Sequence, residues 1–104
     1  MTSVMIDQSI ADLAERAAEA AMVLKSLANE KRLMILCKLL EHGEIGVMAL
    51  SAEVGLSQSA LSQHLARMRD EKIVSFRRDG HSVYYRLADP RVSKLLATLK
   101  STFC

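Results

Sequence analysis

Two groups of residues in this sequence could do chemistry: a polar run near the middle and a pair of cysteines. The polar run, residues 57–69, combines serine, glutamine and arginine, whose side chains hydrogen-bond to DNA bases and phosphates. Glutamine suits adenine in the major groove, and serine can donate or accept a hydrogen bond. The candidate DNA contacts in this run are Ser57, Gln58, Ser59, Ser62, Gln63, His64, Arg67 and Arg69.

The expected roles differ along the run. Ser57 is a favourable N-cap for a helix. Arg67 and Arg69 lie further along this helix and are expected to reach phosphates. His64 stands beside apolar residues, where a lone histidine is more typically a packed or capping group, so its base contact is the weaker interpretation.

A second basic segment follows the polar run. Arg77, Arg78 and His81 flank Asp79-Gly80, a strong signal for a two-residue hairpin turn whose tip would touch the DNA backbone or minor groove. Residues 57–104 hold nine Lys/Arg against four Asp/Glu, whereas residues 1–56 hold five against eight. This asymmetry indicates an electropositive face that could lie against phosphates. The alternative is a solvated charged surface without a partner.

The cysteines, Cys37 and Cys104, are the candidate redox residues. The chain begins without the basic-then-apolar layout of an export signal, so we expect a cytoplasmic, nucleoid-associated protein in which a permanent disulfide is not favoured. No apolar run approaches the roughly 18 residues of a membrane span. Considered singly, Cys37 could be an inert buried cysteine in a stripe of leucines, and Cys104 could be part of a frayed terminus.

The elements that must position these residues follow from periodicity and capping. Helices are expected over about 9–26, 30–42, 46–54 and 57–71, strands over 73–78 and 82–87, and a last helix from Pro90 to about 103. Two helices joined by a turn at Gly55, followed by a hairpin, are typical of a winged helix-turn-helix. We therefore expect a single domain over residues 1–104, mainly α with a small β-hairpin, in the order α-α-α-α-β-β-α.

Residues 24–37 and 57–69 closely resemble the ArsR/SmtB family of bacterial repressors. The resemblance covers nearly the whole chain. It implies a homodimer held by the first helix (about 9–26) and the last helix (about 90–103). It also implies binding to pseudo-palindromic operator DNA, with half-sites about one helical turn apart, roughly 34 Å.

Many members of that family sense metals, and their ligands are missing here. The arsenic and cadmium sensors carry two cysteines in the stretch that matches residues 44–50, and this sequence has none there. The zinc sensors carry Asp and His ligands on the last helix, whereas residues 90–104 contain no histidine. We therefore expect no metal site and no cofactor.

Cys37 and Cys104, in their local settings, resemble the reactive-sulfur-sensing branch of the same family. The resemblance implies that both thiols of one subunit become joined by a disulfide or a bridge with extra sulfur, which releases DNA. The inducer would be an inorganic or organic persulfide or polysulfide. Alternatives are a metal- or peroxide-responsive regulator that uses the same cysteines, and an antirepressor that controls virulence genes.

An enzyme is not expected. The sequence contains no Gly-rich phosphate loop and no acid pair in an apolar setting, and it offers no His/Cys pair with a clear orienting group.

Overall fold

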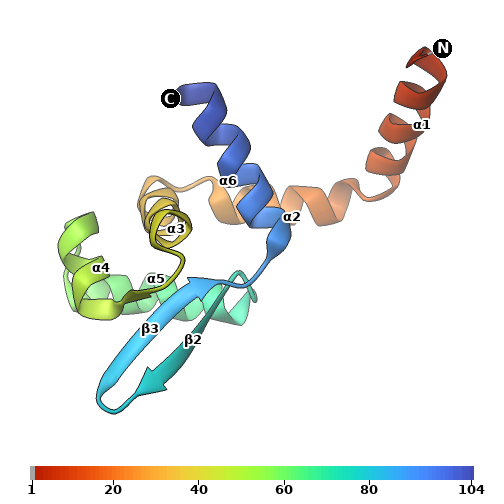
Figure 1. The fold of residues 1–104 in the computed structure, drawn as a ribbon. Helices are drawn as coiled ribbons and strands as arrows, with labels where there is room; N and C mark the ends of the chain where they lie inside the picture. Colours follow the sequence, from red (N-terminus) through yellow and green to blue (C-terminus); the bar gives the residue numbers. More distant parts are fainter. Residues whose placement is uncertain (1) are drawn as a thin grey trace.

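A computed structural model describes the backbone of residues 2–104 and the side chains of residues 9–104. Six helices and three strands follow one another along the chain (Figure 1). Their order is α1 (Thr2–Glu15), α2 (Ala17–Leu27), α3 (Glu30–His42), β1 (Ile45–Gly46), α4 (Val47–Val54), α5 (Gln58–Asp70), β2 (Val74–Asp79), β3 (Ser82–Leu87) and α6 (Pro90–Phe103).

Short polar side chains begin three of these helices. Asn29 accepts a hydrogen bond from the backbone N–H of Arg32 at 3.1 Å, which starts α3. Ser57 does the same for α5, accepting from the N–H of Ala60 at 3.1 Å. Asp89 caps α6 and is followed by Pro90, whose fixed φ suits a first helical position. Local chemistry therefore fixes where the central and last helices begin.

The sheet is a hairpin with a short third strand, in the order β1-β3-β2. In the hairpin Asp79 pairs with Ser82, so the two loop residues are Gly80 and His81, one position later than the predicted Asp79-Gly80 turn. Gly80 has a φ of 62°, which suits glycine at the first position of the loop. The strand β1 was not predicted, and it pairs Ile45 with Tyr85.

A single apolar core lies between α3, α5, the hairpin and α6. The core contains buried residues from each of these elements, including Leu36 of α3, Leu65 of α5 and Leu96 of α6. Figure 1 shows α4 and α5 on one side of α3, with the hairpin projecting below them. The core therefore holds the α4–α5 pair and the hairpin in fixed relation.

The structure differs from the expected first helix and from the expected inner face of the second. Instead of one helix over 9–26, α1 and α2 are separated at Arg16, whose backbone leaves helical geometry (φ −106°, ψ 18°). Leu13 and Leu24 on either side are more than half exposed, so the apolar side chains next to the break pack only in part against the rest of the protein. Cys37, expected on the inner stripe of its helix, is exposed because Ile35, Leu36 and Leu39 form the buried face.

Candidate DNA-binding surface and thiol pair

The pair α4–α5 has the geometry of a helix-turn-helix. Gly55 ends α4 in the left-handed conformation, with a φ of 69°. The Ser51 hydroxyl donates a hydrogen bond to the carbonyl oxygen of Leu56, which closes the turn. Ser57 then starts α5. The tight turn therefore presents α5 as an exposed helix backed by the core.

The buried and exposed faces of α5 separate apolar from polar residues. Leu61, Leu65 and Met68 point into the core. Most of the predicted base and phosphate contacts are exposed, while His64 is half-buried, as a packed or capping histidine would be. The exposed set comprises Ser57, Gln58, Ser59, Ser62, Gln63, Arg67 and Arg69.

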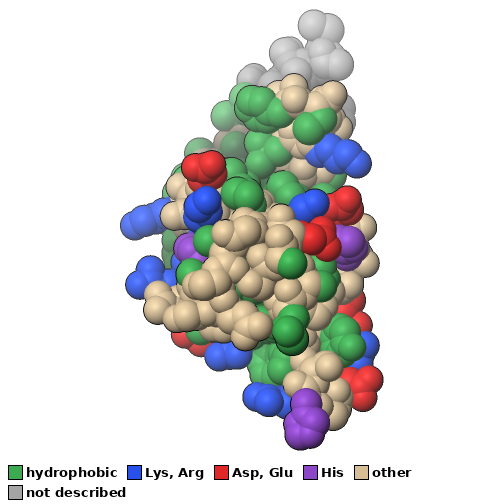
Figure 2. Space-filling model, turned by 90° about the vertical axis from the view of Figure 1, so that its left-hand side faces the viewer, with side chains coloured by type: hydrophobic (Ala, Val, Ile, Leu, Met, Phe, Trp, Pro, Cys, Tyr) green, Lys and Arg blue, Asp and Glu red, His purple; other side chains and the backbone are tan. Residues whose placement is uncertain are grey.

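A groove of about 790 Å³ runs between α5 and the hairpin. Figure 2 looks onto the α4 side of the molecule, where uncharged side chains and backbone dominate the centre and charged side chains of both signs lie around the edge. The groove brings together predicted DNA contacts from both elements, namely Gln58, Ser62, Arg69, Arg78 and His81. Arg67 instead lines a separate depression beside Arg32 and Glu71.

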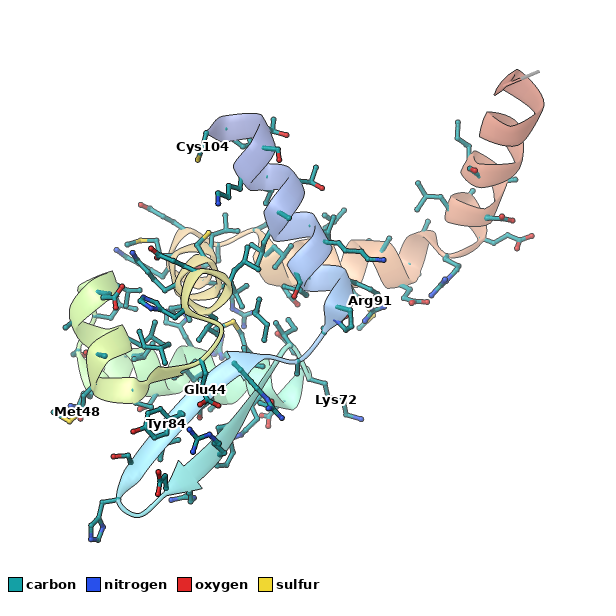
Figure 3. All side chains as sticks on the ribbon, viewed as in Figure 1. Glu44, Met48, Lys72, Tyr84, Arg91 and Cys104 are labelled. Carbon is teal, nitrogen blue, oxygen red and sulfur yellow. The ribbon has the colours of Figure 1, made fainter. Side chains whose placement is uncertain are left out.

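Arg77 was predicted to contact DNA, and the structure gives its charge a protein partner. Its guanidinium forms a bidentate pair with Glu44, with Nη2 and Oε1 2.7 Å apart, and it stacks over the ring of Tyr84 at 4.6 Å. Hydrogen bonding from Arg77 lowers the pKa of the Glu44 carboxyl. Figure 3 shows Glu44 and Tyr84 beside β3 of the hairpin. Arg77 therefore ties the hairpin to the segment before β1.

Two aromatic residues of the groove were missed by sequence reasoning. The Arg69 guanidinium lies over the ring of Phe76 at 5.1 Å, and the Arg78 guanidinium lies over the same ring at 5.6 Å. Arg69 also donates a hydrogen bond to the hydroxyl of Tyr85 at 3.3 Å. Phe76 and Tyr85 are opposite each other in the hairpin register. The sequence did contain a signal for this pair, because the two aromatic residues occupy facing positions in the predicted hairpin.

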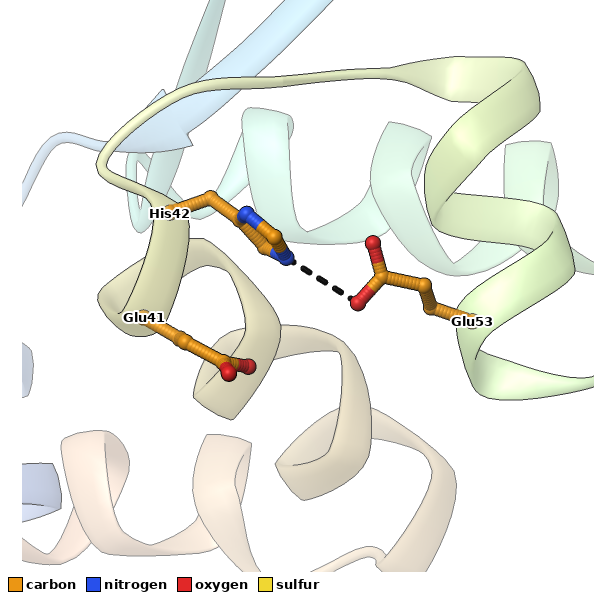
Figure 4. Close-up of side chains that lie close together, drawn as sticks. All are labelled: Glu41, His42 and Glu53. Atoms are coloured by element: carbon orange, nitrogen blue, oxygen red, sulfur yellow. Dashed lines mark hydrogen bonds and ion pairs between the residues drawn. The ribbon is translucent and has the colours of Figure 1, made fainter.

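A polar cluster joins the end of α3 to α4 (Figure 4). His42 Nε2 lies 3.0 Å from Glu53 Oε1, and this hydrogen bond is the main cause of a lowered pKa at Glu53. Potential ligand atoms of Glu41, His42 and Glu53 lie within 4.8 Å of one another. The Lys38 ammonium lies 3.1 Å from Glu41 and 3.4 Å from Glu53, so it supplies the positive charge of the cluster. We assign the cluster a structural role.

The two thiols, on α3 and at the end of α6, are both exposed and are not joined by a disulfide. Helices α3 and α6 pack against each other, and Figure 3 shows Cys104 at the end of α6. Burial by neighbouring atoms raises the pKa of the Cys37 thiol, the charge of Cys104 raises it further, and Lys38 opposes both effects. The two thiols therefore lie on neighbouring helices, each with its sulfur accessible to solvent.

No helix in the described part of the chain combines the length and the apolar character needed to cross a membrane.

Comparison with known proteins places this fold and surface in a family. The model described as "Bacterial regulatory protein, arsR family" matches residues 29–75, from the cap of α3 into β2. Transcriptional activator HlyU of Vibrio cholerae is 40% identical over 96 residues, covering 92% of this chain and 88% of that protein. The chain belongs to the ArsR family.

Two further relatives agree with this ArsR-family assignment. The regulator YgaV of Escherichia coli is 43% identical over 97 residues, covering 91% of this chain and 96% of that one. The crystal structure of the transcriptional repressor BigR from Xylella fastidiosa has a TM-score of 0.84 and 39% identity, covering 89% of this chain and 94% of that one. The predicted winged helix-turn-helix fold is thus confirmed, and the relatives' names describe transcriptional regulators, a non-enzymatic role.

Proposed function

We propose that this ArsR-family regulator is a homodimeric repressor that senses reactive sulfur through Cys37 and Cys104 and then releases operator DNA. The observation that carries the proposal is the placement of the two exposed thiols on α3 and at the end of α6, two helices that pack against each other. The charge of Cys104 also raises the pKa of the Cys37 thiol, in keeping with this placement. Helix α3 leads into α4, so a covalent link between the sulfurs would act on the helix that precedes the helix-turn-helix. We place this activity in the cytoplasm, on nucleoid DNA.

The sulfur chemistry proceeds in two balanced steps. A Cys104 thiolate attacks the sulfane sulfur of a persulfide RSSH, the S–S bond breaks, RSH leaves after protonation, and Cys104 becomes a persulfide. Cys37 then attacks the Cys104 sulfur and expels H₂S, leaving a disulfide. Where both cysteines carry a persulfide, attack of one on the other expels H₂S and leaves a bridge of three sulfurs. We assign the first attack to Cys104 because a raised pKa leaves less thiolate on Cys37 at neutral pH.

Exposed apolar side chains on α1, α2 and α6 support the homodimer. Leu13 and Leu24 are 58% and 54% exposed, and Phe103 at the end of α6 is 80% exposed. A groove of about 520 Å³ between these helices is lined mainly by apolar surface. Large exposed apolar patches mark interaction sites, and a second copy of the chain presents the same patch in return. A dimer would carry two α5 helices to a pseudo-palindromic operator.

A bridge between the sulfurs would weaken operator binding through the dimer geometry. It would fix the end of α6, in the proposed dimer interface, against α3. Coupling of about 1–3 kcal/mol corresponds to a 5- to 150-fold loss of affinity. That range is sufficient for a switch.

The test is operator release by a defined persulfide. DNA selected by the protein from a random library is labelled, and fluorescence anisotropy follows binding before and after addition of glutathione persulfide. The wild-type protein should release the DNA, whereas Cys37→Ser and Cys104→Ser should bind it and stay bound. Release from both variants would refute the two-thiol switch.

The name of one relative favours a second candidate. HlyU of Vibrio cholerae is named an activator, and BigR a repressor. An ArsR-family protein of this kind could raise transcription as an antirepressor, by displacing another repressor from shared DNA. In vitro transcription from a promoter that contains the selected DNA separates the two. Purified protein alone should silence this promoter if the protein is a repressor. It should leave transcription unchanged if the protein is an antirepressor.

The remaining alternative is a metal or peroxide response through the same cysteines. Intact-mass measurement after treatment with persulfide, peroxide or zinc separates these. A mass increase from sulfur atoms that bridge the two cysteines supports the proposal. The alternative is supported by bound zinc, or by a loss of two hydrogens that occurs only with peroxide.

A further inference from the structure

Two guanidinium groups from different elements lie over the ring of Phe76. Arg69 comes from the last turn of α5 and Arg78 from β2, and their guanidinium carbons lie 5.1 and 5.6 Å from the centre of that ring. The Tyr85 ring lies beside it, 5.6 Å away between centroids, and its hydroxyl accepts a hydrogen bond from Arg69. All four residues line the groove between α5 and the hairpin.

Neither guanidinium has a carboxylate partner among residues 9–104. Arg77, the direct neighbour of Arg78, is paired with Glu44 and stacked on Tyr84 instead. Two like charges over one ring repel each other, and among residues 9–104 no carboxylate forms an ion pair with either of them. An arginine that stacks on an aromatic face keeps its N–H donors free at the edge of the guanidinium plane. The groove therefore presents two guanidiniums that are held in place by the rings and are without an ion-pair partner among residues 9–104.

We propose that Arg69 and Arg78 act together as a clamp for the backbone phosphates of one DNA strand, with Phe76 as the residue that positions both. Gln58 and Ser62 line the same groove, so the clamped strand would pass the polar side chains of α5. The clamp sets the distance between α5 and the hairpin, because each of these elements contributes one arginine. This inference rests on the proposed DNA binding and adds the residue that organises its phosphate contacts.

The test measures affinity against salt concentration for selected and for random DNA. Each phosphate contact contributes a slope of about 0.9 to the plot of log affinity against log salt. In a dimer, Arg69→Gln or Arg78→Gln should each lower the slope by about two and weaken both DNAs by the same factor. Arg86→Gln is the matched control on the same hairpin, since Arg86 is exposed on β3 and does not line the groove, and its slope should stay unchanged.

Phe76→Leu tests the positioning role while leaving every charge in place. We expect it to weaken binding at least about tenfold in the wild-type background, since four cation–π contacts, two in each subunit, would no longer hold the guanidiniums in place. In a protein that already carries Arg69→Gln and Arg78→Gln, the same change should have no further effect. Circular dichroism and thermal unfolding identify variants that fail to fold, and Phe76→Tyr, which keeps a ring, should restore binding.

Two results would overturn the clamp. One is an unchanged affinity and slope for Phe76→Leu. The other is an equal loss with and without the two arginines, which would show a general packing effect. A failure of the proposed function is distinct: a wild-type protein without preference for its selected DNA, or without a persulfide response, would refute the repressor and leave the clamp intact.

Discussion

At the residue scale, the environment of Cys37 distinguishes it from an ordinary exposed thiol. Burial raises its pKa first, the neighbouring Cys104 adds to this, and Lys38 opposes it. Its thiolate is therefore scarcer at neutral pH than that of a free cysteine, which makes it suited to the second step of the sulfur reaction rather than the first.

Two substitutions should move the pKa of Cys37 in opposite directions. Cys104→Ser removes a group that raises it, so the pKa should fall, while burial keeps it above its ordinary value. Lys38→Gln removes the opposing charge, so the pKa should rise. The rate of Cys37 alkylation by iodoacetamide against pH, followed by peptide mass spectrometry, reports both shifts. An identical profile in all three proteins would show that the two sulfurs do not interact.

At the scale of elements, the α4–α5 turn depends on one glycine. Gly55 has a φ of 69°, and a Cβ added there would meet no atom within 4 Å. Gly55→Ala should therefore destabilise the fold through backbone strain alone, by roughly 1–2 kcal/mol. Urea unfolding measures this loss. A neutral result would mean that the turn relaxes to another conformation without cost.

The hairpin and the segment before β1 are joined by the Glu44–Arg77 pair. The pKa of Glu44 is lowered in the folded protein, so this contribution to stability is present above its ordinary value of 4.5 and is lost as pH falls through the lower folded value. Glu44→Gln should reduce stability at neutral pH and flatten its decline in acid. Urea midpoints at pH 7 and below pH 4 test this, and parallel curves for both proteins would contradict it.

Sequence reasoning was accurate for elements that local chemistry specifies. Asn29, Gly55 and Ser57 mark helix ends by their own conformational preferences, and the structure places the ends of α3, α4 and α5 there. The two-residue strand β1 has no such signal, because it exists only through its pairing with β3. The break at Arg16 was missed because periodicity continues across it.

The candidate site was also predictable only where local spacing specifies it. The exposed face of α5 follows from helical spacing, whereas the pairing of Arg77 with Glu44 joins positions 33 residues apart. The ring of Phe76 meets Arg69 only once the hairpin packs on α5. Cys37 was assigned to the wrong face because the leucines around it suggested a stripe displaced from the one that the core uses.

At the scale of the whole molecule, the proposed repressor requires a second copy of the chain. Phe103 is 80% exposed on α6, and Phe103→Glu together with Leu13→Glu should produce a monomer that binds operator weakly. Met48→Glu is the matched control for the oligomeric state alone, since Met48 is 74% exposed on α4, outside the proposed dimer interface but on the groove proposed for DNA (Figure 3). Analytical ultracentrifugation should show a monomer only for the double variant. A dimer that survives that double change would place the interface elsewhere.

The whole-molecule switch depends on whether the two sulfurs of one subunit become covalently joined. The most direct measurement is the mass of the proteolytic peptides from persulfide-treated protein, compared with the fraction of operator released in the same sample. The account predicts one cross-linked species that contains Cys37 and Cys104 from a single chain, with an abundance that rises in step with DNA release. Release of DNA while both cysteines remain on separate, unlinked peptides would contradict it.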